Sequence, residues 1–286
     1  MLDTILKRQL HSLIQEAFHE DLEDRGDITS ISTLSEDICG KAELILKMKG
    51  VIAGLPLLQP ICHYIDSDIQ IQLFTEDGQM LPSGFTIAKF RGSLRSILIC
   101  ERTALNFLQR LSGIATITKQ YVDRISHTKA KILDTRKTTP GLRALEKYAV
   151  CQGGGMNHRS GLFDMILIKD NHIDACGGID NAITRCLNYL KLKKMTVPIE
   201  VETRTLHEVR EALRFPIQRI MLDNMSVQTM SEAIRLINER IETEASGNIR
   251  LENVKKIAET GVNFISVGAL THSANALDIS MDIAKE

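Results

Sequence analysis

Hydrophobic and polar positions follow one pattern in the first third of the chain and another in the rest. Between Ile5 and Phe18, apolar residues recur at helical spacing and predict an N-terminal helix. Further strands are expected at 42–48, 69–74 and 85–91, and further helices at 55–65, 94–111 and 115–126, the last two separated at Gly113. Strands and helices gathered without regular alternation predict a small α+β domain.

From about residue 130, short apolar strands alternate with amphipathic helices. Six such strands are expected, and each ends in polar residues: 131–137, 164–171, 198–203, 219–224, 241–248 and 264–270. This rhythm predicts parallel strands joined by right-handed crossovers, and a barrel built from them gathers the strand ends on one face. Six units fall short of the usual eight, so an incomplete α/β barrel is predicted. An open doubly wound sheet is the alternative, but no Gly-x-Gly-x-x-Gly turn supports it.

The composition excludes several classes of protein. The chain has 286 residues, with 35 Lys and Arg against 36 Asp and Glu, so it is no globally basic nucleic-acid binder. Aromatic residues make up 4% and Trp is absent, which is few for base stacking or a membrane belt. The six cysteines form no Cys-x-x-Cys pair, which argues against a structural metal and favours a reducing compartment. Because no signal peptide or membrane span is evident, a cytoplasmic protein is predicted.

Positively charged residues gather after the first two strands of the predicted barrel. Residues 134–172 include six Lys or Arg and four Asp or Glu, in a chain that is slightly acidic overall. Arg136, Lys137, Arg159 and Lys169 lie at or just beyond strand ends, where they would form a pocket for a polyanion. A solvated charged face is the alternative. However, cations that converge without an anion repel each other by about 4 kcal/mol per pair at 4 Å and a dielectric constant of 20.

The next two predicted strands end in acids, Glu202 and Asp223. Carboxylates at these positions could hold ribose hydroxyls directly or through Mg²⁺. For Asp223 the alternative is a cap on the helix that follows. Glu200 shares its side of the strand with Glu202 and is the weaker candidate for a second inward carboxylate.

The last two predicted strands end in small residues, Ser246-Gly247-Asn248 and Val267-Gly268-Ala269, each followed by an expected helix. Backbone N–H groups at such turns can bind a monophosphate, and the loops after the final two strands of many barrels do so. Gly153–Gly155 lacks the ending of a P-loop and is interpreted as a hinge or flexible loop. His158 is interpreted as an anion contact, and metal ligation by histidines is not expected.

Eight short motifs occur in order along the chain: ERTALN (101–106), DTRKTTPG (134–141), GGGMNHR (153–159), KDNH (169–172), IEVE (199–202), LDN (222–224), SGNI (246–249) and SVGA (266–269). Together they resemble the quinolinate phosphoribosyltransferase family, and the DTRKTTPG and NHR–KDNH blocks are highly specific to it. The likeness runs from about residue 20 to residue 275. One departure is visible at Glu23–Thr29, where the family's Gly-x-Gly-Asp-x-Thr motif lacks its first glycine.

The resemblance implies an N-terminal α/β sandwich domain over 1–113 and an incomplete (β/α) barrel with parallel strands over 114–286, which carries the active site. The last helix is expected at 272–283, and it is allowed to pack against the N-terminal domain instead of the barrel. The implied substrates are 5-phosphoribosyl 1-diphosphate and quinolinate, with Mg²⁺ as cofactor. The implied products are nicotinate mononucleotide, CO₂ and diphosphate, on the route to NAD. A homodimer with shared sites is the implied working unit, and a hexamer of dimers is left open.

The resemblance also assigns roles to individual residues. The implied substrate-binding residues are Arg102 (in the neighbouring subunit's site), Thr135, Arg136, Lys137, His158, Arg159, Lys169, Glu202, Asp223, Ser246, Gly247, Asn248, Val267, Gly268 and Ala269. The implied catalytic residues are Lys137, Lys169, Glu202 and Asp223, and the last two would hold the metal through water or substrate. Two other functions are considered: a Schiff-base aldolase with Lys137 or Lys169 as nucleophile, and a binding protein without turnover.

Overall fold

The computed structural model describes residues 4–284, which form two compact units. The first unit comprises the chain up to Lys119, Thr139–Gly154 and the segment from Ser273 onward. The second unit comprises Gln120–Thr138 and Gly155–His272. The chain therefore passes between the units four times, whereas the sequence analysis divides it once, and the boundary at residue 113 stays a prediction.

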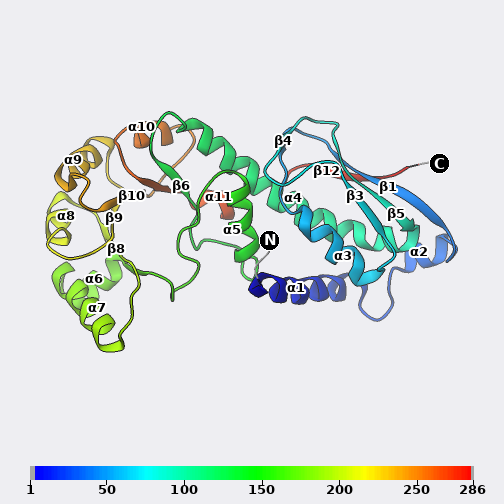
Figure 1. Cartoon of the computed structure of the whole chain (residues 1–286), viewed down its shortest axis with the longest axis horizontal. Coiled ribbons are helices and arrows are strands. Elements are labelled where there is room, and N and C mark those ends of the chain that lie inside the picture. The colour runs from blue at the N-terminus through cyan, green and yellow to red at the C-terminus, as the bar shows by residue number, and fades with distance from the viewer. Residues whose placement is uncertain (1–3, 285–286) are drawn as a thin grey trace. The chain divides into compact units, whose positions relative to one another are not determined.

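An antiparallel sheet forms the centre of the first unit, with strand order β12-β1-β5-β3. The elements of this unit are α1 (Thr4–Leu22), α2 (Ile28–Thr33), β1 (Cys39–Leu46), β2 (Gly50–Val51), the 3-10 helix η1 (Leu55–Leu57), α3 (Leu58–Ile65), β3 (Gln70–Leu73), β4 (Met80–Leu81), β5 (Thr86–Ser93), α4 (Leu94–Arg124, whose end belongs to the second unit), α5 (Arg143–Gln152) and β12 (Ile279–Ala284). Helices α3 and α4 lie along this sheet (Figure 1). The strands expected in the first third of the chain are confirmed.

The C-terminal segment corrects the sequence analysis. A helix is expected at 272–283, but the structure has the four-residue α11 (Ala269–His272) followed by strand β12, which pairs antiparallel with β1. Leu277 and Ile279 are buried while Asp278 between them is exposed, which is the period of a strand. The segment does return to the N-terminal sheet, but as an edge strand that satisfies the backbone groups of β1.

The expected helix break at Gly113 is also wrong, because α4 runs without interruption from Leu94 to Arg124. A Cβ atom at position 113 would lie 2.0 Å from the carbonyl oxygen of Asn275. The glycine is therefore explained by the close approach of another backbone segment to the helix. Gln109 fixes the same approach, since its carbonyl accepts from the N–H of Leu277 at 2.9 Å.

The departure from the family motif at Glu23–Thr29 leaves its capping function intact. Asp27 is the N-cap of α2, and its carboxylate accepts from the N–H groups of Thr29 and Ser30 at 3.0 Å each. Hydrogen bonds from Ser30 are the main reason that the pKa of Asp27 is lowered. Gly26, with φ +67°, supplies the left-handed residue before the cap.

The second unit is an open barrel of six parallel strands in the order β6-β11-β10-β9-β8-β7. Its elements are β6 (Lys131–Leu133), β7 (Ile166–Ile168), α6 (Asp170–Cys176), α7 (Ile179–Lys193), β8 (Ile199–Thr203), α8 (Leu206–Ala212), β9 (Arg219–Asp223), α9 (Val227–Ile237), β10 (Glu242–Ser246), α10 (Val254–Ala258), β11 (Phe264–Ser266) and α11. All six expected strands are present, and within residues 4–284 the edge strands β6 and β7 are not paired with each other. The predicted incomplete barrel is confirmed.

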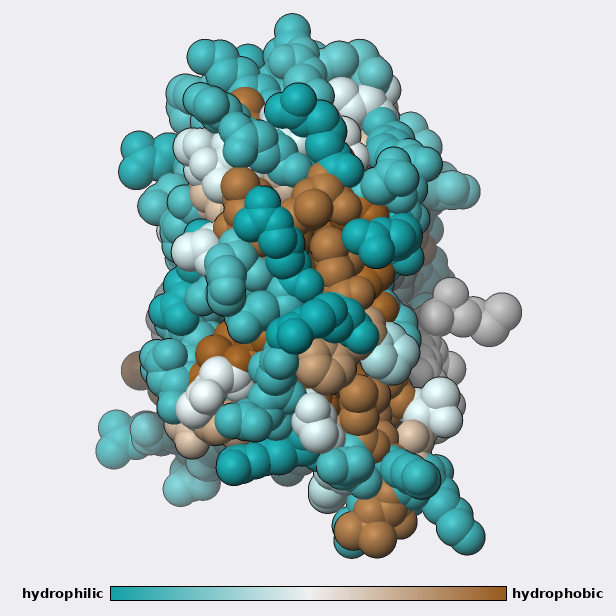
Figure 2. Space-filling view, turned by 90° about the vertical axis from the view of Figure 1, so that its left-hand side faces the viewer, coloured by the Kyte–Doolittle hydropathy of each residue, from teal (hydrophilic) through white to brown (hydrophobic). Residues whose placement is uncertain are grey.

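Helices α6 to α10 lie outside this curved sheet and cover it (Figure 1). Their buried faces and the strands form an apolar core, to which Val209, Ala233 and Val254 contribute from the helices. Figure 2 shows one face of the molecule, on which hydrophilic side chains surround an apolar band. No helix within the described part of the chain combines the length and apolar character needed to cross a bilayer.

Candidate active site

A pocket of about 800 Å³ lies at the carboxyl ends of the parallel strands, where barrel proteins bind their ligands. Thirteen of the fifteen predicted substrate-binding residues line it. They are Thr135, Arg136, Lys137, His158, Arg159, Lys169, Glu202, Asp223, Ser246, Gly247, Asn248, Gly268 and Ala269. The expectation that residues from separate strand ends converge is therefore met by the geometry.

Two predicted residues do not line this pocket. Val267 is 1% exposed, and its N–H group donates to the carbonyl of Leu133 at 2.9 Å, so it belongs to the core and the strand ladder. Arg102 lies on α4 in the first unit and is exposed. Its entry into a neighbouring subunit's site stays a prediction.

Positive charges converge on the pocket. Burial lowers the pKa of Arg159, and the nearby Arg136 guanidinium lowers it further, so the two cations lie close enough to repel each other. Arg159 Nη1 donates to the carbonyl of Met165 at 3.1 Å, which orients the guanidinium. Lys169 Nζ lies 3.6 Å from Glu202 Oε2. The four cations line one pocket, although Arg136, Lys137 and Lys169 are exposed, and an anionic ligand would relieve the repulsion between Arg136 and Arg159.

Lys137 is held through its backbone. Its N–H donates to Thr135 Oγ1 at 3.0 Å, and its carbonyl accepts from Thr271 Oγ1 at 2.8 Å. A Cβ atom at Gly268 would lie 3.1 Å from Lys137 Cδ, so the small residue leaves room for the lysine to cross the turn. The glycine is thus explained by the path of Lys137 as well as by the phosphate-binding turn that the sequence predicts.

Glu202 and Asp223 end adjacent strands, β8 and β9, and both face the pocket. Burial raises the pKa of Glu202, Lys169 opposes this, and Asp223 raises it again, so the two carboxylates act on each other. The N-cap of α9 is Ser226, whose side chain accepts from Thr229, and this removes the alternative that Asp223 caps the helix. Two neighbouring carboxylates that open to a solvent-filled pocket fit the oxygen donors that Mg²⁺ prefers.

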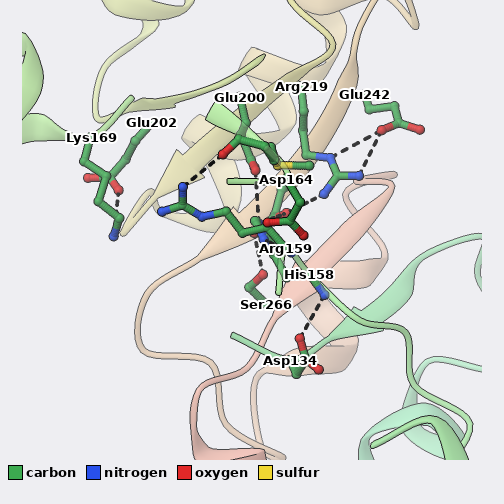
Figure 3. Close-up of polar contacts among 12 residues, drawn as sticks. Asp134, His158, Arg159, Asp164, Lys169, Glu200, Glu202, Arg219, Glu242 and Ser266 are labelled. Carbon is green, nitrogen blue, oxygen red and sulfur yellow. Dashed lines mark hydrogen bonds and ion pairs between the residues drawn. The ribbon is translucent and has the colours of Figure 1, made fainter. Parts of the chain in front are cut away.

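Four charged or ionisable side chains, His158, Glu200, Arg219 and Glu244, form a largely buried cluster (Figure 3) at the floor of the pocket, which His158 and Glu244 line. His158 Nε2 lies 3.0 Å from Glu200 Oε2 and 3.4 Å from Glu244 Oε2. Arg219 Nη1 lies 3.0 Å from Glu244 Oε2, and Ser266 Oγ also donates to Glu244. Glu244 is therefore the centre of this floor cluster, with three donors around it.

The floor cluster fixes the ring of His158. Burial opposes a charge on this ring, but Glu200 and Glu244 outweigh it and raise the pKa of His158. The backbone N–H of His158 donates to the buried Asp134 at 2.8 Å, and in the neutral form of the ring His158 Nδ1 accepts from the N–H of Arg159 at 2.7 Å. Its Nε2 proton thus lies between the glutamates, so the ring supports Arg159 from below instead of pointing a nitrogen at a ligand.

The pKa values of Glu200 and Glu244 are shifted in opposite directions. Burial and the neighbouring Glu244 raise the pKa of Glu200 to about 7, whereas His158, Ser266 and Arg219 outweigh burial and lower the pKa of Glu244. Ligand atoms of His158, Glu200 and Glu244 lie within 4.8 Å of one another, which is close enough for metal coordination. Arg219 already supplies a positive charge to Glu244, so the cluster is compensated without a metal.

Several residues of the pocket were missed by sequence reasoning. They are Leu167, Asp170, Met221, Asn224, Glu244, Ile249, Arg250, Ser266 and His272. Asp170 and Asn224 each follow a predicted residue directly, so extending each strand end by one polar residue would have found them. Glu244 and Ser266 lie inside strands, where only the inward side of the alternation indicates them.

A cationic pocket with paired carboxylates lies at the carboxyl ends of an open parallel barrel, so the fold and site define a barrel protein whose pocket is suited to a phosphorylated or polycarboxylate ligand. Residues 27–112 match the family model of the quinolinate phosphoribosyl transferase N-terminal domain, and residues 114–282 match that of its C-terminal domain. The chain belongs to the quinolinate phosphoribosyltransferase family.

Named relatives agree with this family. The chain is 47% identical over 292 residues to a chloroplastic nicotinate-nucleotide pyrophosphorylase [carboxylating] of Oryza sativa, covering 97% of this chain and 78% of the relative. It is 46% identical over 275 residues to a probable nicotinate-nucleotide pyrophosphorylase [carboxylating] of Bacillus subtilis, covering 96% and 93%.

Solved structures share the whole fold. The nicotinate-nucleotide pyrophosphorylase of Francisella tularensis is 41% identical with a TM-score of 0.91, and the likeness covers 97% of this chain and 96% of that one. The corresponding structure from Ehrlichia chaffeensis is 39% identical with a TM-score of 0.91, covering 96% and 98%. The mixed fold, with an antiparallel N-terminal sheet and a six-stranded parallel sheet, is thus that of the family.

Proposed function

We propose that this chain transfers the phosphoribosyl group of 5-phosphoribosyl 1-diphosphate to quinolinate, with decarboxylation to nicotinate mononucleotide. The observation that carries the proposal is the convergence of Arg136, Lys137, Arg159 and Lys169 with two carboxylates in one pocket. Quinolinate is a dianion and the sugar donor carries several phosphate charges, so both substrates need this density of fixed cations. The names of the family's members support the same reaction, which belongs to NAD biosynthesis.

The division of the pocket assigns a part to each group of residues. Arg136 and Arg159 would bind the quinolinate carboxylates, because a guanidinium offers a planar pair of donors to a carboxylate. Lys137 and Lys169 would bind the diphosphate and stabilise its departure. The turns at 246–248 and 268–269 would hold the 5-phosphate through backbone N–H groups.

Glu202 and Asp223 would hold the ribose hydroxyls and Mg²⁺, partly through water. When bound, the metal neutralises charge on the leaving diphosphate. Burial raises the pKa of Glu202, and Lys169, 3.6 Å from its carboxylate, opposes this rise.

The reaction needs little proton transfer from the protein. The C1′–O bond to diphosphate breaks through an oxocarbenium-like centre, and the ring nitrogen of quinolinate forms the new bond to C1′. The resulting positive ring stabilises the electron pair left on C2 when the adjacent carboxylate departs as CO₂, and C2 then takes up a proton. Positioning and electrostatic stabilisation are therefore the main contributions of this site.

A coupled product assay tests the proposal. With quinolinate, diphosphate and CO₂ should appear in a one-to-one ratio, and nicotinate should give neither. Lys169→Met should abolish turnover, whereas Lys193→Met, an exposed lysine at the end of α7, should not. Diphosphate release without CO₂, or a borohydride-trapped adduct on Lys137 or Lys169, would reject the proposal in favour of another acceptor or of an aldolase.

The proposal includes a homodimer in which Arg102 completes the neighbouring site, with a hexamer of dimers as a larger assembly, in the cytoplasm. The exposed position of Arg102, outside the pocket of its own chain, supports its use in another chain, and the free state of all six cysteines supports a reducing compartment. Arg102→Ala and Arg136→Ala should each be inactive and should regain activity when mixed. Arg124→Ala, on the same helix, is the matched control, and no recovery in mixed dimers would reject the shared site.

A further inference from the structure

Asn224 links the acid at the end of β9 to the turn after β10. Its Nδ2 donates to Asp223 Oδ2 at 2.7 Å, and its Oδ1 accepts from Asn248 Nδ2 at 3.0 Å. Its backbone N–H donates to the carbonyl of Ser246 at 2.9 Å. One residue therefore connects two parts of the pocket that come from different strands.

The chemistry of the partners fixes the orientation of this amide. An ionised carboxylate has no proton to donate and can only accept hydrogen bonds. The NH₂ group of Asn224 must therefore face Asp223. The carbonyl oxygen of Asn224 then faces Asn248, whose NH₂ group donates. The backbone carbonyl of Asn248 accepts from Asn253 Nδ2 at 2.9 Å, and Asn253 Oδ1 accepts from the N–H of Arg250 at 2.8 Å. The side-chain bonds therefore run in one direction from Asn248 through Asn224 to Asp223, and Asn253 holds the backbone of the turn from the other side.

The backbone supports the same arrangement. Asn224 and Asn248 both have φ +52°, a left-handed conformation that asparagine tolerates better than most residues. Gly247 has φ +91°, and a Cβ atom there would lie 2.2 Å from Asn224 Oδ1. Gly247 is therefore required both by its own conformation and by the side chain of Asn224 packed against it.

We infer that Asn224 is a positioning residue, which fixes Asp223 relative to the 246–248 turn and so sets the spacing at which the phosphoribosyl donor is bound. The inference rests on the proposed function, in which Asp223 holds the ribose hydroxyls and the turn holds the 5-phosphate. A rigid sugar phosphate needs both groups at a set distance, and the directional amide supplies it without touching the quinolinate side of the pocket.

The test compares two Asn→Gly substitutions at left-handed positions. Asn224→Gly removes the amide and keeps the backbone permissive, and Asn238→Gly does the same at the end of α9, where φ is +50°. Because a hydrogen bond to a charged group is lost, Asn224→Gly should raise the KM for 5-phosphoribosyl 1-diphosphate about tenfold. The KM for quinolinate should stay within about twofold, and Asn238→Gly should change neither.

A second comparison isolates the contact with Gly247. Gly247→Ala alone should weaken donor binding strongly, because the methyl group meets the Asn224 amide as well as an unfavourable φ. In the Asn224→Gly background, Gly247→Ala should weaken donor binding several times less. The clash with the Asn224 amide is then absent, and only the unfavourable φ at position 247 remains. Asn224→Asp should bind the donor more weakly than Asn224→Gly, because its carboxylate would face Asp223.

Calorimetric titration with 5-phosphoribosyl 1-diphosphate alone separates this inference from the proposed reaction, because it requires no turnover. If the wild-type protein binds the donor but releases no CO₂ from quinolinate, the proposed reaction is refuted. The inference is then decided by whether Asn224→Gly weakens binding of the donor. Equal effects of Asn224→Gly on both KM values, unchanged donor binding, or additive effects of the Gly247 and Asn224 changes would overturn the inference.

Discussion

Removing the charge of Glu244 should destabilise the protein far more than removing that of Glu200, although both glutamates are fully buried in the floor cluster. The Glu244 carboxylate accepts hydrogen bonds from Ser266, Arg219 and His158, and these partners lower its pKa. In Glu244→Gln the amide presents an NH₂ group to one of these donors, and Arg219 loses its buried counter-ion. Breaking a buried ion pair costs about 3–5 kcal/mol. We expect about 3 kcal/mol, because Arg219 keeps Glu242 at 3.0 Å.

Glu200→Gln is the matched control, since it lies on the adjoining side of His158. Its pKa is raised to about 7 by burial and by Glu244, so near neutrality its carboxyl group is already substantially protonated. Glutamine resembles that protonated form and still accepts from His158 Nε2. The expected cost at pH 7 is therefore below about 1 kcal/mol.

The two variants also differ in how stability depends on pH. Between pH 4.5 and about 7, folded Glu200 keeps a proton that the unfolded chain has released, so the wild-type stability supplied by this group is full below pH 4.5 and is lost as the pH rises. One pKa unit corresponds to about 1.4 kcal/mol, which makes the loss about 3 kcal/mol over this window. Glu200→Gln lacks this loss, so its stability relative to wild type should rise from pH 5 to pH 8.

Urea unfolding of the three proteins, followed by circular dichroism at pH 5, 6, 7 and 8, measures both effects. Equal destabilisation by the two substitutions at pH 7 would show that Glu244 is not the charged centre of the cluster. A difference between Glu200→Gln and wild type that does not change with pH would refute the raised pKa.

Three further substitutions test the first unit. Arg110→Met leaves the fully buried Glu146, now 2.7 Å from Arg110 Nη2, without its cation, and should cost about 3 kcal/mol in chemical denaturation, while Arg124→Met should cost little. Gly113→Ala would improve helix propensity by about 1 kcal/mol, but the clash with the Asn275 carbonyl should reverse the sign and lower the Tm. Asp27→Ala removes the N-cap of α2 and should cost about 1 kcal/mol at pH 7. Because the pKa of Asp27 is lowered, this difference from wild type should disappear as the pH falls through the range where Asp27 is protonated, and a constant difference would contradict the capping role.

The parallel barrel could be predicted because the sequence pattern of each strand and helix is contained in a short segment of the chain. Each strand is a short apolar run that ends in polar residues, and the strand-to-helix rhythm permits few topologies. Strand β12 could not be predicted in this way, because residues 272–283 are compatible with a helix and become a strand through pairing with β1, which is more than two hundred residues away. Gly113 was misjudged for the same reason, since the segment that requires it comes from the far end of the chain.

The residues of the site also differ in whether the sequence alone could predict them. Residues just past strand ends, such as Arg136, Lys169 and Asp223, were predicted because parallel strands present these positions on one face. Arg219 and Glu244 lie within strands, and a charged residue there indicates an exposed side unless its buried partners are known. Val267 was included with the small residues of the expected phosphate-binding turn after the last strand, yet its side chain lies in the core.

The floor cluster and the pocket above it are linked by charge. Two buried carboxylates at the floor of the pocket would repel an anionic ligand unless they were neutralised. Arg219 neutralises Glu244, and Glu200 retains a proton as its pKa rises to about 7, so the floor adds little net negative charge. The potential felt by a ligand is then set by the cations at the strand ends. On this argument Arg219 supports anion binding through its ion pair with Glu244, although Arg219 itself does not line the pocket.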